Sequence, residues 1–141
     1  MQNPSPILAT AVALVAWSFF IWAWMYATRI PAILRAKMRM DPRAPRGEQM
    51  ATLPAEVRWK ADNYNHLMEQ PTLFYAIVIV LALLGRDRGV DLGLAWAYVG
   101  LRVIHSLVQV LINKIELRFA LFLISSLVLL AMTVRAGLAF L

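Results

Sequence analysis

The segment NYNHLMEQPTLFY, residues 63–75, joins a polar stretch to an apolar run that continues to residue 84. Residues 72–84 alone are too short to cross a bilayer, because a spanning helix needs about 20 residues. A crossing helix must therefore begin further back and carry Asn65, His66 and Glu69 to the membrane boundary or below it. A carboxylate costs about 2.5–3.5 kcal/mol at the bilayer centre unless it is paired or faces water. Glu69 therefore predicts a buried partner elsewhere in the chain.

The composition is that of a membrane protein. Of the 141 residues, 61% are hydrophobic, whereas soluble domains contain about half. Four apolar segments predict an all-α integral membrane protein that forms a four-helix bundle. The expected helices cover about 6–34, 55–84, 92–113 and 118–140, with a basic loop over about 35–54. Four crossings of about 20 residues use more than half of the chain, so residues 1–141 are predicted to form a single membrane domain.

Residue usage excludes several kinds of chemistry. The sequence contains no cysteine, which rules out disulfides, a catalytic protein thiol and cysteine-based metal sites. Any thiol chemistry would therefore need a thiol ligand. The two histidines alone do not predict a metal site. The formal net charge is +6, but the basic residues cluster beside apolar segments, which is typical of membrane topology and not of nucleic-acid binding.

The distribution of basic residues predicts the topology. Eight of the 14 basic residues lie between Arg29 and Lys60, in and around the only long connection. By the positive-inside rule this loop faces the cytoplasm, so both termini are expected on the non-cytoplasmic side. A multi-pass location in a bacterial inner membrane is expected. Arg135, near the outer end of the last helix, is expected to snorkel to the membrane surface.

Polar side chains recur on one face of the third apolar segment. Their steps of four, three, four and four place them in a single stripe along a helix. The stripe consists of Tyr98, Arg102, His105, Gln109 and Asn113. Arg102 lies about halfway along the segment, where an unpaired guanidinium is very unfavourable. Glu69 is therefore the expected counter-charge of Arg102.

Three short motifs, in order and on the expected helices, suggest a family. The second helix carries an Asn/His-x-x-Glu-x-Pro pattern that includes His66, Glu69 and Pro71, the third carries Arg102-x-x-His105, and Arg118 opens the fourth. The chain thereby resembles the membrane-associated proteins in eicosanoid and glutathione metabolism, the MAPEG family, over nearly its whole length. The resemblance implies a homotrimer of four-helix protomers, with glutathione bound in a basic cleft between neighbouring subunits.

The resemblance also implies roles for individual residues. Glu69 would hold the amino group of glutathione or pair with Arg102, and Arg29 would meet a glutathione carboxylate. Arg118 would lie near the sulfur and favour the thiolate, which makes it the candidate catalytic residue. The implied cofactor-binding residues are Arg29, Asn65, His66, Glu69, Arg102 and His105.

The sequence departs from the family pattern at several positions. Phe119 and Phe122 stand where transferases and synthases of the family usually have a serine and a tyrosine, and Gln109 stands where a tyrosine often follows. Two readings therefore compete. One is a glutathione-dependent transferase or peroxidase-like enzyme acting on hydrophobic electrophiles or lipids at the subunit interface. The other is a non-catalytic membrane scaffold or lipid-binding member of the same fold.

A small proton-coupled exporter is a third, more remote alternative. Such transporters usually place their membrane glutamate in the first helix, which here has no charge between residues 7 and 27. The expected partners are further copies of the chain, membrane lipids and a hydrophobic small-molecule substrate.

Overall fold

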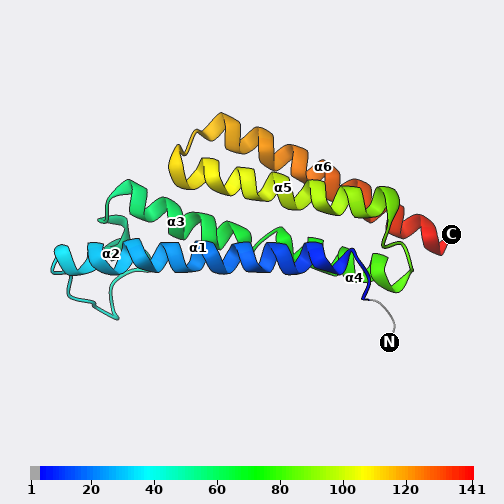
Figure 1. Cartoon of the computed structure of the whole chain (residues 1–141). Helices are drawn as coiled ribbons and strands as arrows, with labels where there is room; N and C mark the ends of the chain where they lie inside the picture. Colours follow the sequence, from blue (N-terminus) through cyan, green and yellow to red (C-terminus); the bar gives the residue numbers. More distant parts are fainter. Residues whose placement is uncertain (1–3) are drawn as a thin grey trace.

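The computed structural model describes residues 4–141, and this part of the chain contains helices and no strand. Figure 1 shows the elements in chain order. They are α1 (Leu8–Arg35), α2 (Glu48–Ala51), α3 (Ala55–Leu67), α4 (Pro71–Leu83), α5 (Gly89–Leu111), α6 (Ile115–Gly137) and a final 3₁₀ turn (Leu138–Phe140).

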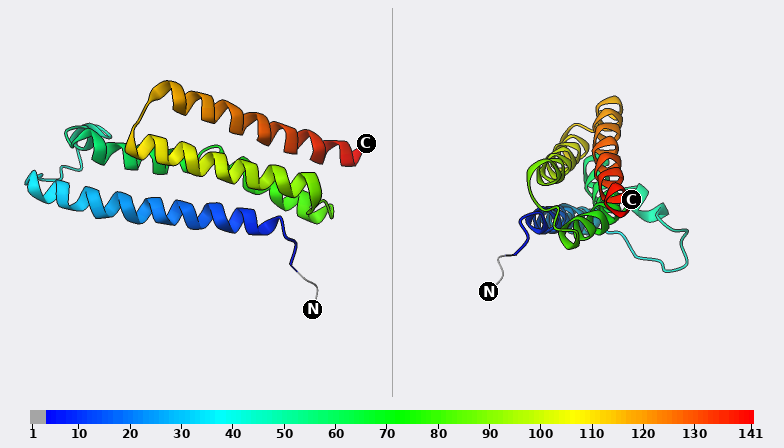
Figure 2. Two further views of the ribbon diagram at one scale, coloured as in Figure 1. Left: turned by 45° about the horizontal axis from the view of Figure 1, so that its top comes forward. Right: turned by 90° about the vertical axis from the view of Figure 1, so that its right-hand side faces the viewer.

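Four helical stretches are long and apolar enough to cross a membrane. They are Leu8–Arg35, Ala55–Leu83, Gly89–Leu111 and Ile115–Phe140. The prediction of an all-α, four-helix membrane bundle is therefore confirmed. In Figures 1 and 2, α5 lies between α6 and α1, and α3 and α4 run beside α1. The start of α1 and the end of α6 lie at one end of the bundle. At the other end, α1 and α3 extend beyond the turn between α5 and α6.

The second crossing is broken in the middle. The sequence predicts one crossing over 55–84 with a bend near Pro71, and the chain forms α3 and α4 with a short interruption at residues 68–70. Pro71, the first residue of α4, has no N–H to donate, and its ring would clash with the carbonyl of Leu67 in a continuous helix. The N–H of Met68 instead donates to the carbonyl of Asn65 at 2.9 Å. The interruption reorients the side chains on either side of it.

The apolar core draws on every membrane crossing. Fully buried side chains include Leu14 and Ile21 of α1, Phe74 of α4, Tyr98 of α5 and Met132 of α6. The rings of Phe74 and Tyr98 stack with their centroids 4.4 Å apart. These contacts hold α4 against α5 and position the polar side chains that lie one or two turns away.

A cluster of charged side chains joins α5 and α6 at the end of the bundle that carries the termini. Arg135 donates from Nε to Asp91 Oδ1 at 2.6 Å and from Nη2 to Asp91 Oδ2 at 3.1 Å. Arg86 donates from Nε to Asp91 Oδ2 at 3.2 Å and from Nη1 to the carbonyl of Arg135 at 2.9 Å. The expectation that Arg135 simply snorkels is therefore wrong, because Asp91 comes close enough to pair with it.

Replacing Asp91 by Asn should destabilise the bundle by about 1–3 kcal/mol, since two arginines lose their charged hydrogen-bond acceptor. Thermal unfolding in detergent should show a lower Tm than for the unmodified protein. Asp87→Asn is the matched control, because Asp87 only approaches the exposed Arg88 at 4.0 Å. Equal Tm values for the two variants would contradict the structural role of Asp91.

Candidate functional site

The polar stripe predicted on α5 is buried. Tyr98, Arg102, His105 and Gln109 are each at most 2% exposed. Their helical spacing alone placed them on one face, and the packing of α5 between α1, α3 and α6 turns that face inward. The sequence-based prediction of one polar stripe along the third crossing is thus confirmed for these four residues, and the structure shows that the stripe is buried.

Arg102 is the most demanding of these side chains. Its guanidinium is fully buried, and Nη2 donates to the backbone carbonyl of His66 at 3.2 Å. Nε and Nη1 have no hydrogen-bond partner among residues 4–141. The guanidinium carbon lies 5.8 Å from the centre of the Phe122 ring. A buried cation with so few hydrogen-bond partners is costly. Additional polar groups near Arg102 would therefore stabilise it.

The expected ion pair between Glu69 and Arg102 does not form within the protomer. The Glu69 side chain is 68% exposed, and its Oε2 lies 3.1 Å from His66 Nδ1. The cause is the interruption between α3 and α4, which directs Glu69 outward from the bundle. His66 thus connects the two residues, because its ring meets Glu69 while its carbonyl meets Arg102.

His66 and His105 lie beside Arg118 in an open cavity of about 350 Å³. The remaining lining residues are Ile115, Phe119 and Phe122. The two imidazole rings have their centroids 5.0 Å apart, and the centroid of the Phe122 ring lies 5.3 Å from that of His66. The cavity therefore combines a cation and two imidazoles with an apolar wall, at the junction of α3, α5 and the start of α6.

The turn between α5 and α6 positions Arg118. Asn113 has a positive φ of 53° and donates its N–H to the carbonyl of Val108 at 2.7 Å, which ends α5. Its side-chain Oδ1 accepts a hydrogen bond of 2.6 Å from Arg118 Nη1. Arg118 Nε is buried and has no partner in the described part of the chain. One nitrogen of the guanidinium is thus held by Asn113, while Nε is buried without a hydrogen-bond partner within the described residues.

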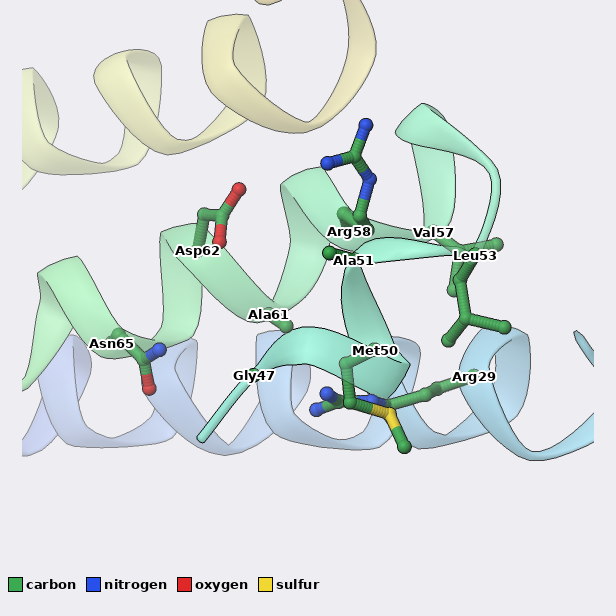
Figure 3. Close-up of a pocket in the computed structure, with 10 residues that line it drawn as sticks. All are labelled: Arg29, Gly47, Met50, Ala51, Leu53, Val57, Arg58, Ala61, Asp62 and Asn65. Carbon is green, nitrogen blue, oxygen red and sulfur yellow. The ribbon is translucent and has the colours of Figure 1, made fainter. Parts of the chain in front are cut away.

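Arg29 and Asn65 lie in a different cavity, of about 270 Å³, between α1, α3 and the α2 segment. Arg58 and Asp62 of α3 and Met50 of α2 also line it. In Figure 3, Asn65 points toward α1 while Arg58 and Asp62 point away from it. Consecutive residues of a helix are about 100° apart, so Asn65 and its neighbour His66 face different cavities. A single protomer therefore does not bring all the predicted site residues together.

Several buried polar residues were missed in the sequence. Asn63 is fully buried and its Nδ2 donates to Ser106 Oγ of α5. Gln70, next to Pro71, donates from Nε2 to Ser126 Oγ at 2.7 Å and accepts from the Tyr98 hydroxyl at 3.2 Å. Positions 63, 66 and 70 share one face of a helix, which was the available signal.

The arrangement suits an anionic organic ligand better than a metal ion. In the described residues no group of three or more His, Cys, Asp or Glu side chains could hold a metal. The cavity beside Arg118 offers a guanidinium edge, two imidazoles and, next to His66, an exposed carboxylate on Glu69. These groups can meet a carboxylate or thiolate together with an ammonium group of a ligand.

Comparison with known proteins identifies the family. The sequence profile described as the MAPEG family matches residues 7–138, nearly the whole chain. No curated protein and no solved structure matches the chain. The four membrane-spanning stretches agree with this match. The chain belongs to the MAPEG family.

Proposed function

We propose that the chain is a glutathione-dependent transferase or peroxidase-like enzyme that acts on hydrophobic electrophiles or lipids at the interface between copies of the chain. The cavity formed by His66, His105 and Arg118 carries the proposal, because it places a guanidinium and two imidazoles next to apolar side chains. Its location on a bundle of helices that can span a membrane would give a bilayer-dissolved substrate access.

The chemistry of glutathione fits these groups. The tripeptide has two carboxylates, one ammonium group and one thiol whose reference pKa is about 8.5. A guanidinium beside the sulfur stabilises the thiolate, which is the reactive nucleophile. Arg118 would supply this charge, and the exposed carboxylate of Glu69 would meet the ammonium group. The thiolate would then attack an electrophilic carbon held against Phe119 and Phe122, and the leaving group would depart with the bonding electrons.

A site shared between copies would reconcile the two cavities. Arg29 and Asn65 line one cavity, while His66 and Arg118 line another. In a closed ring of identical subunits, one face of each protomer meets a different face of its neighbour. A homotrimer of this kind would bring Arg29 of one copy toward Arg118 of the next. The membrane-exposed apolar side chains of the bundle are compatible with such an assembly.

The same family and the distribution of charge support a location and topology. We propose that the protein lies in a bacterial inner membrane with the basic loop between α1 and α3 in the cytoplasm. Eight of the 14 basic residues lie in and around this loop, as the positive-inside rule requires of a cytoplasmic connection. Both termini would then lie on the non-cytoplasmic side.

One observation favours the non-catalytic alternative, a membrane scaffold or lipid-binding protein. Phe119 and Phe122 line the cavity where a hydroxyl group would hydrogen-bond a thiolate. The Phe122 ring also packs on His66 and lies over Arg102. In this alternative, the buried polar groups hold helices and subunits together and no thiolate forms.

Calorimetry on the detergent-purified protein should detect saturable glutathione binding. Arg118→Ala should weaken it about tenfold or more, which corresponds to the loss of a charge-assisted hydrogen bond. Arg88→Ala, which removes an exposed arginine from the turn before α5, is the control and should bind normally. Absence of binding to the unmodified protein at millimolar glutathione would exclude the glutathione proposal and leave the scaffold alternative.

Co-expression of two inactive variants should reveal a site shared between copies. Arg29→Ala and Arg118→Ala should each abolish conjugation of glutathione to chlorodinitrobenzene in homotrimers. Random assortment of the two variants should restore about a quarter of the sites, because an intact Arg29 from one copy then meets an intact Arg118 from another. Failure to recover activity, with mixed trimers demonstrated by two affinity tags, would place the whole site within one protomer.

A further inference from the structure

A further cavity lies away from His66, His105 and Arg118. It measures about 650 Å³ and lies between the end of α1 and the start of α3. It shares no lining residue with the cavity of His66, His105 and Arg118, and only Val57 with the cavity of Arg29 and Asn65. On α1 its wall consists largely of small side chains, which leave the space open. The polar and charged residues that line it are Thr28, Arg35, Glu56 and Lys60.

We propose that this cavity binds the phosphate of an anionic phospholipid headgroup through Lys60 and Arg35. The site is independent of the glutathione proposal, and the two can be tested separately.

Lys60 is an unusually buried cation for the end of a membrane crossing. Its residue surface is 8% exposed, and its Nζ donates to the backbone carbonyl of Glu56 at 2.8 Å. The ammonium also lies 5.4 Å from the centre of the Trp24 ring. An ammonium group has three N–H donors, and the carbonyl of Glu56 is its one hydrogen-bond acceptor in the described residues. A buried cation with unused donors favours an anionic ligand.

Arg35 brings a second cation to the same cavity from the other helix. It is the last residue of α1 and is exposed, so its guanidinium can reach a ligand without moving the helix. The carboxylate of Glu56 offsets one of the two positive charges that line the cavity. The net charge of the lining is then +1, which complements the single negative charge of a phosphodiester better than a multiply charged phosphate.

The position of the cavity favours a lipid as the source of the phosphate. Trp22, Trp24 and Tyr26 precede it on α1, and the basic loop follows it. Tryptophan and tyrosine side chains concentrate at the level of lipid headgroups. Lys60 lies against Trp24, so its ammonium is next to a side chain of the type that concentrates at the headgroup level. Attraction between anionic lipid and basic residues near the membrane surface supports the same assignment.

The test measures binding of a fluorescent short-chain phosphatidylglycerol to the full-length protein in detergent, with phosphatidylcholine of the same chain length for comparison. Lys60→Gln and Arg35→Gln remove one charge each, and Lys60→Arg retains the charge. Arg43→Gln is the matched control, because Arg43 is an exposed basic residue of the loop that lines none of the described cavities. Arg35→Gln also guards against misfolding, since the side chain it changes is exposed.

Phosphatidylglycerol should bind saturably and more tightly than phosphatidylcholine. Lys60→Gln and Arg35→Gln should each weaken its binding about tenfold, whereas Lys60→Arg should retain most of it. The Arg43→Gln protein should bind as the unmodified protein does. Equal weakening in Arg43→Gln and Arg35→Gln would overturn the proposal, because the attraction would then be that of the whole basic loop. Displacement of the probe by millimolar inorganic phosphate would overturn the assignment to a lipid.

Discussion

The hydrogen bond from Arg102 to the backbone carbonyl of His66 joins the two features on which the rest of the structure depends. One is a guanidinium that is fully buried in a membrane-spanning bundle. The other is the interruption before Pro71, where the backbone of the second crossing departs from a continuous helix. Within a bilayer, backbone groups released from a helix need partners inside the protein. Arg102 supplies one such partner, and so the third crossing is tied to the second where the latter bends.

The interruption before Pro71 determines which neighbouring side chains face the interior and which face the surface. The bend directs Glu69 outward to His66 Nδ1, while Gln70 turns inward to meet Tyr98 and Ser126. Two nitrogens of Arg102 are left without partners in the described residues. A buried charge whose partner is missing destabilises a protein strongly, because the charge is left uncompensated. The guanidinium of Arg102 is therefore costly to bury within the protomer, while the carboxylate of Glu69 remains exposed.

The family membership and the local chemistry carry different amounts of information. Membership in the MAPEG family accounts for the number of helices and the apolar surface of the bundle. It does not decide between catalysis and a structural role, because function resides in the site and not in the fold. In the glutathione proposal, the guanidinium of Arg118, held by Asn113, would stabilise the thiolate. The phenyl rings of Phe119 and Phe122 remove hydroxyl donors from the same cavity. The glutathione proposal thus depends on whether the charge of Arg118 is sufficient without those hydroxyls.

The amino-acid sequence alone determined the membrane class, the four crossings and the polar stripe of α5. These follow from the length of apolar runs and from helical spacing, which are local properties of the chain. The tertiary structure alone decided that Asn63 and Gln70 face inward while Glu69 faces outward. It also decided that Asp91 pairs with Arg135 across 44 positions of sequence. The rotation of α3 and the approach of distant residues depend on how whole helices pack, because no local pattern specifies which of two adjacent polar faces meets a neighbour.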